Sequence, residues 1–462
     1  MTDSYQFASF RDPSGFLFYK DGTLYRQVNQ SYREHYDHLM KSGLYEALVS
    51  QGLMVHHAEI DDVEAVNKDL AYRVIQPEKV NFISYPYEWC FHELRSAALI
   101  TLRLARTALD HGMILKDASA YNLQFVGGRW QLIDTLSFEI YKEGEPWVAY
   151  KQFCQHFLAP LALMAYRDPR LNLMSRLFID GIPLDITADL LPARTKLRFG
   201  LMTHIHLHAR TQKRYAGKEV RREDVKGKVS QRSLVGLLDS LRNTVKGLTI
   251  RTSGTEWADY YQETNYSESA FEQKKAIVKR YIERVQPSGV WDLGANTGEF
   301  SRLASDAGIF TVAFDVDPGA VSRNYIQARK NHEGNILPLV MDLANPSPGL
   351  GWGHRERESL VDRGPVSMVL ALALVHHLAI SNNVPLGKLA QFLSEISEYL
   401  VIEFVPKSDS QVQRLLRSRE DIFDRYTVSG FEADFQVYFE ILEQTPVPGS
   451  ERILYLMKAK KR

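Results

Sequence analysis

The C-terminal half of the chain alternates between two hydrophobic periods. Segments with apolar residues at every third or fourth position predict helices, one of them from Glu268 to Val285. Short apolar runs between such segments predict buried strands. The strand candidates begin near Val290, Thr311, Leu337, Ser367, Tyr399 and Ile453. Strands that alternate with helices in this way predict an α/β fold with a mostly parallel, doubly wound sheet.

The N-terminal half shows a different order of elements. Short strands separated by turn signals reach to about residue 30 and are followed by a helix near 32–51, strands near 54–60 and 71–75, and a long helix near 91–109. A hairpin follows around Gly127-Gly128, and residues from about 147 to 215 have mostly helical spacing. This order predicts an α+β domain ahead of the α/β domain.

Residues 209–251 differ in composition from both halves. Lys and Arg outnumber Asp and Glu there and glycines recur, although residues 233–248 keep a helical apolar spacing. We therefore expect a basic, partly helical linker at 209–251. It would separate an N-terminal domain of residues 1–208 from a C-terminal domain of residues 252–462.

Composition narrows the class of protein. A chain of 462 residues is long enough for two or three domains, and 45% hydrophobic and 24% charged residues are globular values. Lys plus Arg equal Asp plus Glu at 56 each, so no global field attracts duplex nucleic acid. The basic linker leaves contact with RNA open, but a solvated charged linker is the favoured interpretation, so we do not expect a nucleic-acid partner. Cys90 and Cys154 are the only cysteines, which argues against a disulfide scaffold. The first residues lack a secretion signal and no apolar run is long enough to span a membrane, so we expect a cytoplasmic protein.

The most informative motif is VWDLGANTGEF at 290–300. A predicted strand ends in Asp292, turns through Gly294 and reaches Gly298 just before a helical pattern, as in loops that bring a backbone close to a nucleotide-type ligand. The order is neither G-x-G-x-x-G nor a phosphate loop ending in Gly-Lys-Ser/Thr, and Glu299 would repel a pyrophosphate. Asp315 ends the next strand, where a carboxylate can accept both hydroxyls of a ribose. Together they predict an adenosine pocket.

The segment resembles the first motif of class I S-adenosylmethionine-dependent methyltransferases, and the resemblance extends to the C-terminus. It implies that the residues around the bend line the methionine end of S-adenosylmethionine, that one acid binds ribose, and that a later acid with its neighbour contacts adenine. In that order the residues are Asp292, Gly294, Asn296 and Gly298, then Asp315, then Asp342 and Leu343. The alternative is an ordinary strand–turn–helix set with acids at exposed strand ends.

The fourth strand candidate ends in ALALVHHLAI, which places His376 and His377 near the expected methyl group. An imidazole there could remove a proton from an oxygen nucleophile, whereas the alternative is that one histidine packs in the core and the other is solvated. The Asn/Asp-Pro-Pro-Tyr/Phe motif with which related enzymes bind planar nitrogens is absent, which argues against methylation of adenine or glutamine nitrogen. Glu403, after the fifth strand candidate, fits a ligand role or a surface role equally.

A second constellation lies in the N-terminal half. Asp117 and Asn122 in KDASAYN, followed by Asp134 in LIDTLSF, resemble the catalytic and metal-binding loops of protein-kinase-like folds. The resemblance implies Asp117 as a catalytic base and Asn122 and Asp134 as magnesium ligands, with ATP as a cofactor. The sequence departs from that pattern because the glycine-rich lid is reduced to Gly15 and Arg26 stands where lysine is usual. The alternatives are a degenerate domain that only binds a ligand, or a helical substrate-binding domain.

The motifs SYPYEW, LKDASAYN, DTLSF and ALALVHHLAI, in this order, resemble the bacterial methyltransferase family that includes the rhizobial nodulation protein NoeA. The resemblance implies an α+β protein-kinase-like domain followed by a Rossmann-like methyltransferase domain. We therefore expect methyl transfer to a small-molecule or glycan-like, saccharide acceptor. The alternatives are a bifunctional or ATP- and Mg-dependent phosphotransferase, or a non-catalytic ligand-binding protein.

Overall fold

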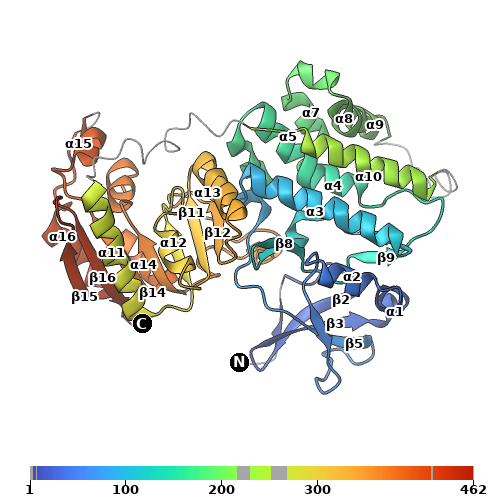
Figure 1. Cartoon of the computed structure of the whole chain (residues 1–462), viewed down its shortest axis with the longest axis horizontal. Coiled ribbons are helices and arrows are strands. Elements are labelled where there is room, and N and C mark those ends of the chain that lie inside the picture. The colour runs from blue at the N-terminus through green and yellow to red at the C-terminus, as the bar shows by residue number, and fades with distance from the viewer. Residues whose placement is uncertain (1–3, 7, 216–228, 251–267, 418–419, 461–462) are drawn as a thin grey trace. The chain divides into compact units, whose positions relative to one another are not determined.

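The computed structural model describes residues 4–6, 8–215, 229–250, 268–417 and 420–460 (Figure 1). The chain divides into two compact units. The first unit comprises Met1–Ile250 together with Leu350–Arg357, and the second comprises Arg251–Gly349 together with Glu358–Arg462. Residues 216–228 and 251 of the predicted linker lie outside the described residues.

The first unit begins with a five-stranded antiparallel sheet of order β1-β2-β3-β5-β4. Its strands are β1 Ser4–Tyr5, β2 Gly15–Lys20, β3 Thr23–Asn29, β4 His57–Glu59 and β5 Ala71–Pro77. Asp21 and Gly22 join β2 to β3 with positive φ angles of 49° and 78°, the conformation that a two-residue hairpin requires. Two further antiparallel pairs follow, β6 Met113–Leu115 with β9 Phe138–Ile140, and β7 Leu123–Val126 with β8 Arg129–Leu132.

Helices make up most of the remaining first unit. With η marking 3-10 and π helices, they are η1 Gln30–Tyr32, α1 Arg33–Lys41, α2 Leu44–Ser50, η2 Pro86–Glu88, α3 Phe91–Asp110, η3 Ala120–Asn122, α4 Tyr150–Phe153, η4 Cys154–Leu158, α5 Ala159–Tyr166, η5 Pro169–Leu173, α6 Met174–Leu177, α7 Leu184–Leu190, η6 Ala193–Leu197, α8 Phe199–Leu201, η7 Met202–Leu207, α9 His208–Tyr215 and α10 Gln231–Lys246. The expected order of strands, helix, strands, long helix and hairpin is therefore confirmed.

The region expected to be a linker contributes a packed helix. Helix α10 lies beside α3 (Figure 1), and Gln231 donates a hydrogen bond to the Leu109 carbonyl at 3.0 Å. Its apolar face buries Leu234, Leu238, Leu241 and Val245. The helix belongs to the first unit because this apolar face, which the sequence already showed, needs a partner in order to leave water.

A short segment from far along the chain belongs to the first unit as well. Residues 350–357, which include η10 Trp352–His354, are held there by the Arg11 guanidinium, which contacts both Glu356 carboxylate oxygens at 2.5 and 2.9 Å. The Arg357 guanidinium lies 4.1 Å from the centroid of the Tyr121 ring, within range of a cation–π contact. The Glu356 side chain is 1% exposed and the Arg11 side chain 53%, so the carboxylate of this bidentate pair is buried while the arginine reaches solvent.

The second unit is built on a seven-stranded sheet of order β12-β11-β10-β13-β14-β16-β15. Its strands are β10 Val290–Leu293, β11 Thr311–Asp315, β12 Ile336–Val340, β13 Val366–Ala371, β14 Ser397–Phe404, β15 Phe439–Pro446 and β16 Ile453–Ala459. The first five in the order are parallel, while β16 runs antiparallel to both β14 and β15. The predicted mostly parallel, doubly wound sheet is confirmed.

Helices pack on this sheet and complete its core. They are α11 Glu268–Val285, α12 Ser301–Ser305, α13 Pro318–Lys330, η11 His377–Ser381, α14 Leu386–Ile396, α15 Ser410–Leu416 and α16 Val428–Phe435. Val278 and Ile282 of α11 belong to the same buried cluster as Val290 of β10 and Leu370 of β13. Helix α11 thereby covers the strands from which the predicted bend emerges.

Strand β15 is absent from the sequence prediction. Its burial alternates only weakly, with Phe439 fully buried and Glu440 exposed, and it is one of the two edge strands of the sheet. Because most of its residues are partly or fully exposed, it carries a weaker hydrophobic signal than β12, the other edge strand, whose burial is nearly continuous. Among the described residues, no helix is both long and apolar enough to span a lipid bilayer.

Candidate functional site

The bend after β10 has the backbone geometry that its sequence implies. Gly294 and Asn296 both have positive φ, at 80° and 50°, and asparagine is among the few residues that tolerate this region. The N–H groups of Gly294 and Ala295 both donate to the Phe314 carbonyl of β11, at 2.8 and 2.9 Å. The bend is therefore tied to the end of the neighbouring strand.

Asp315 fixes the same bend from the end of β11. Its two carboxylate oxygens accept the backbone N–H groups of Asn296 at 2.8 Å and Asp317 at 2.9 Å. Burial raises the pKa of Asp315 to about 6, and these two hydrogen bonds oppose the shift. Each oxygen retains a lone pair beyond its backbone contact, so the carboxylate can still accept hydrogen bonds from a ligand.

Asp292, the third residue of β10, is 2% exposed. The Ser301 hydroxyl of α12 donates to it at 2.6 Å. Burial raises the pKa of Asp292 to about 7, the Ser301 hydrogen bond lowers it, and the nearby Asp315 carboxylate raises it. Asp292 also lines the cavity described next, so its carboxyl can both order the loop and face a ligand.

One cavity of about 580 Å³ collects these groups, and its size is typical of a small-molecule site. Its lining consists of Phe271, Lys274, Asp292, Gly294, Ala295, Asn296, Phe300, Asp315, Val316, Met341, Asp342, Leu343, Leu372, Ala373, Leu374, His377, Leu378, Ser381, Asn382, Gln411, Arg414 and Leu415. Most of these residues follow the carboxyl ends of parallel strands, where ligands of doubly wound sheets sit.

Most of the residues predicted for the cofactor meet at this cavity. Asp342 and Leu343 reach it from the end of β12, and Asp342 is exposed and accepts the Ala344 N–H at 2.8 Å. Asp292, Gly294, Asn296 and Asp315 line it too. The structure therefore brings three predicted acids and the bend into one space.

Gly298 is not among the lining residues. Its φ is 82°, and a Cβ added there would lie 2.6 Å from the Asn324 amide nitrogen and 2.8 Å from an Arg302 guanidinium nitrogen. Close packing between the bend and α13 therefore explains why residue 298 is a glycine. The sequence pattern alone could not separate this reason from close approach of a ligand.

The two histidines differ in position. His377 lines the cavity, whereas His376 does not and is 0% exposed. Burial lowers the pKa of His377 to about 4, and it lowers the pKa of His376 well below the usual value, with a further contribution from His377. Both imidazoles are therefore neutral at pH 7, and only His377 faces the space where a ligand can bind.

A buried ion pair at the cavity involves a residue that sequence reasoning missed. Lys274 of α11 lies 2.6 Å from a Glu403 carboxylate oxygen, and the same oxygen accepts the Ala373 N–H at 2.7 Å. The Lys274 and Glu403 side chains are 3% and 0% exposed. The signal was present in the sequence, because Lys274 occupies the apolar stripe of α11 between Phe271 and Val278.

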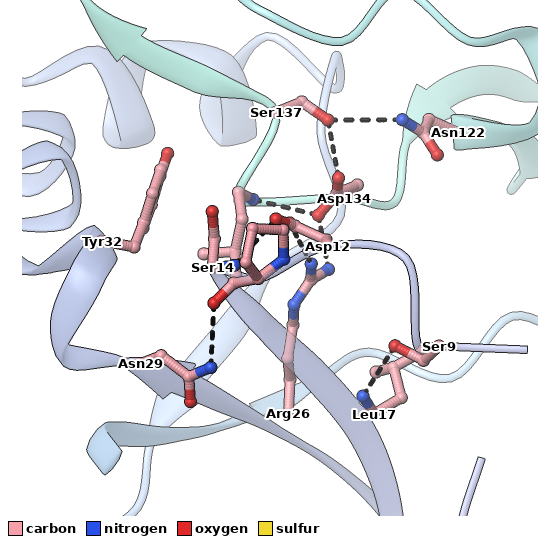
Figure 2. A network of polar contacts seen from close by, with 12 residues as sticks. Ser9, Asp12, Ser14, Leu17, Arg26, Asn29, Tyr32, Asn122, Asp134 and Ser137 are labelled. Atoms are coloured by element: carbon pink, nitrogen blue, oxygen red, sulfur yellow. Dashed lines mark hydrogen bonds and ion pairs between the residues drawn. The ribbon is translucent and has the colours of Figure 1, made fainter. Parts of the chain in front are cut away.

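The predicted polar set of the first unit also comes together. The Ser137 hydroxyl links Asn122 and Asp134 (Figure 2). It donates to the Asp134 carboxylate at 2.8 Å and accepts a hydrogen bond from the Asn122 amide at 3.4 Å. Burial and the nearby Asp134 carboxylate raise the pKa of Asp117. The three residues predicted as base and metal ligands therefore share one neighbourhood. Within the described ranges, however, no cluster of His, Cys, Asp or Glu has the form of a metal site.

Two departures from the kinase-like pattern are visible in the same network. The Arg26 guanidinium is paired directly with Asp134 and lies 3.6 Å from Asp12 (Figure 2). Burial alone would raise the pKa of Asp134, but the Arg26 guanidinium and the Ser137 hydroxyl lower it. The kinase-like resemblance also implies an acid on the helix after the strand that carries Arg26, and Glu34, the acid in the first turn of α1, is exposed.

Gly15 has a structural explanation as well. A Cβ at this position would collide with the Gln27 carbonyl of β3 and lie 2.9 Å from a Leu136 methyl group. The glycine therefore permits close packing of β2 and β3, and this reason suffices without a nucleotide.

The second unit has the strand order 3-2-1-4-5-7-6, with the last strand antiparallel and a cavity lined by strand-end acids. This order and this cavity define the fold of class I methyltransferases. The nodulation protein NoeA of Rhizobium meliloti (strain 1021) is 34% identical to the chain over 452 residues, which are 97% of this chain and 94% of NoeA. The chain belongs to the family of nodulation protein NoeA.

Comparisons with solved structures give smaller similarities. Magnesium protoporphyrin IX methyltransferase (ChlM) from Synechocystis PCC 6803 is 15% identical, with 44% of this chain and 93% of that chain covered and a TM-score of 0.32. N-methyltransferase NodS from Bradyrhizobium japonicum WM9 is 12% identical, with 42% of this chain and 99% of that chain covered and a TM-score of 0.32. No protein-family model matches the chain.

Proposed function

We propose that the protein is an S-adenosylmethionine-dependent methyltransferase that acts on a small-molecule or glycan-like acceptor. The observation that carries this proposal is the single cavity that joins the Gly294 bend to Asp315, Asp342 and His377. The chemistry of this lining fits the cofactor, since a sulfonium cation is favoured beside carboxylates and a ribose needs acceptors for its two hydroxyls.

Each group in the cavity has a defined task in this proposal. Asp315 binds the ribose hydroxyls, and Asp342 with Leu343 holds the adenine. The bend at Gly294 and Asn296 holds the methionine end of the cofactor, with Asp292 ordering the loop behind it. The bound cofactor supplies an electrophilic methyl group, and the chain supplies its orientation and the exclusion of water.

His377 is the proposed general base for an oxygen nucleophile. Its ring lines the cavity, and its low pKa of about 4 keeps it neutral and able to accept a proton at pH 7. A base of this strength suits an acceptor hydroxyl that is itself acidic. His376, which does not line the cavity, would act only by packing against His377, whose ring centroid is 4.1 Å away.

Calorimetry with S-adenosylmethionine tests the proposal. Wild type should bind the cofactor, and Asp315→Asn should weaken binding about 10- to 100-fold, the range expected for the loss of hydrogen bonds to a charged acceptor. Asp306→Asn is the matched control, because Asp306 is exposed at the end of α12 and does not line the cavity. A wild-type protein that does not bind the cofactor would end the proposal.

A second candidate function belongs to the first unit. The gathering of Asp117, Asn122 and Asp134 favours a kinase-like domain that binds ATP with Mg²⁺ and transfers a phosphoryl group. The Arg26–Asp134 pair means that a metal ion must first displace the guanidinium from this carboxylate. We therefore expect weak magnesium binding and rank this function below methyl transfer.

Titration with ATP and Mg²⁺ tests this second candidate. Asp134→Ala should abolish magnesium-dependent ATP binding, whereas the exposed Asp110→Ala should leave it unchanged. ATP binding that is indifferent to Asp134→Ala, or that is absent from wild type, removes the candidate and leaves a domain that only binds another ligand or packs.

A further inference from the structure

The cavity has a second polar region besides the strand-end acids. Ser381 and Asn382 reach it from the end of η11, and Gln411 and Arg414 reach it from α15. Gln411 and Arg414 are three residues apart on one helix, so their side chains project from the same face. None of these four residues belongs to a motif that the sequence singled out.

Sheet topology separates this region from the acids. Asp315 and Asp342 follow β11 and β12, which lie on one side of the central strand β10, while η11 and α15 follow β13 and β14 on the other side. If β10 holds the methionine end of the cofactor, the ribose and adenine extend toward β11 and β12. The space beside η11 and α15 then remains for the methyl acceptor.

Arg414 carries the uncompensated positive charge of this region. The other cation in the lining, Lys274, is paired with Glu403 at 2.6 Å. Arg414 is exposed, and within the described part of the chain no carboxylate lies within ion-pair distance of its guanidinium. An arginine that lines a cavity with its five donors available can recognise a carboxylate, sulfate or phosphate.

Helix α15 is fixed firmly enough to make this position specific. Asp409 caps the helix by accepting the Gln411 N–H at 2.9 Å, and its other oxygen accepts Arg452 Nε at 2.8 Å. Arg452 in turn lies 3.6 Å from Glu403, the partner of the cavity lysine. Val412 is fully buried on the opposite side of the helix turn. The helix that carries Arg414 is therefore tied, through Asp409, Arg452 and Glu403, to the lysine that lines the same cavity.

We propose that Arg414, with Gln411 beside it, recognises an anionic group on the methyl acceptor. This inference rests on the proposed methyltransferase function and names its substrate class as an anionic small molecule or saccharide. A charge-assisted hydrogen bond at a partly exposed site corresponds to about 10- to 100-fold in catalytic efficiency.

The test uses the full-length protein and S-adenosylmethionine with a labelled methyl group. A small-molecule and saccharide extract of cells that produce the protein is first divided by an anion exchanger at pH 7 into retained and unretained fractions. Acceptor activity should appear in the retained fraction. Arg414→Gln should lower kcat/KM for that fraction about 10- to 100-fold, and Arg414→Lys should recover part of the loss because it keeps the charge.

Arg417→Gln is the matched control, since Arg417 is an exposed arginine on the next turn that does not line the cavity. Cofactor affinity separates the two proposals. If Arg414→Gln weakens S-adenosylmethionine binding as much as it lowers kcat/KM, Arg414 holds the carboxylate of the cofactor and the inference is overturned. Labelling confined to the unretained fraction, or unchanged activity of Arg414→Gln, also overturns the inference about Arg414. In either case, cofactor binding by the wild-type protein would still support the methyltransferase function.

Discussion

The buried pair of Lys274 and Glu403 gives the strongest prediction about the second unit. A single Glu403 oxygen receives both the Lys274 ammonium at 2.6 Å and the Ala373 N–H at 2.7 Å. Ala373 lines the cavity and has a φ of 50°, a strained value for alanine. The pair therefore holds the backbone that follows β13 in a conformation that it would otherwise leave.

Glu403→Gln should destabilise the second unit strongly. It leaves the Lys274 ammonium buried without its counter-charge, and removing one partner of a buried pair costs about 3–5 kcal/mol. For a unit of this size each kcal/mol shifts the Tm by about 2–4 °C, so the expected decrease is about 6–20 °C. Lys274→Met with Glu403→Gln removes both charges of the pair and leaves Arg452 with its other acid, Asp409, at 2.8 Å, so the double variant should be less destabilised than Glu403→Gln alone.

The assay is calorimetric unfolding of the full-length protein, in which the two units are followed as separate transitions. Burial lowers the pKa of Lys274, opposed by Glu403, so the folded Glu403→Gln protein loses this proton more readily than the unfolded chain. The unfolded state then binds more protons, and the stability of this variant should rise with pH toward about 10.

Lys275→Met provides the control for the pair. Lys275 is the next residue of α11, and its ammonium lies 3.2 Å from the partly exposed Glu299, so its loss should cost about 1 kcal/mol or less. A Tm of Glu403→Gln within about 2 °C of wild type would refute the reasoning, as would a double variant that is as unstable as the sum of its single changes.

Three further predictions concern single positions. Because the folded pKa of Asp292 is about 7, above its usual value of 3.8, its contribution to stability is complete below about pH 4 and is lost as pH rises through 7. Asp292→Asn should therefore gain stability relative to wild type between pH 4 and 7, by at most about 4 kcal/mol in denaturant unfolding, and a pH-independent difference would contradict the buried carboxyl. Gly298→Ala should lower the free energy of unfolding by about 1–3 kcal/mol through its φ of 82° and the contact with Asn324, while calorimetry should show cofactor affinity within about twofold of wild type. A loss of affinity at unchanged Tm would instead place Gly298 at the cofactor. Gly15→Ala should lower the Tm of the first unit because its Cβ meets the Gln27 carbonyl, at a cost of about 1–3 kcal/mol, and an unchanged Tm would count against the packing role.

Local patterns account for much of the fold of the second unit. The apolar runs at β10, β11 and β12 and the amphipathic helix α11 are strong signals, because these three parallel strands are almost entirely buried and read as continuous hydrophobic runs. The bend at Gly294 is equally local, since a positive φ restricts which residues can occupy it. Position after a strand end was enough to predict that Asp315 and Asp342 would share one cavity.

The sequence by itself therefore determined the periodicity of the elements, the conformation of the cofactor-type bend and the acids at the strand ends. Only the tertiary structure decided which side chains face each other across the chain. The ion pair of Lys274 with Glu403 joins residues far apart in sequence. The same is true of the Arg452–Asp409 contact that holds α15, and of the ion pair between Arg26 and Asp134. Such contacts depend on how helices and strands pack, and no local spacing encodes the distance between two side chains on different elements.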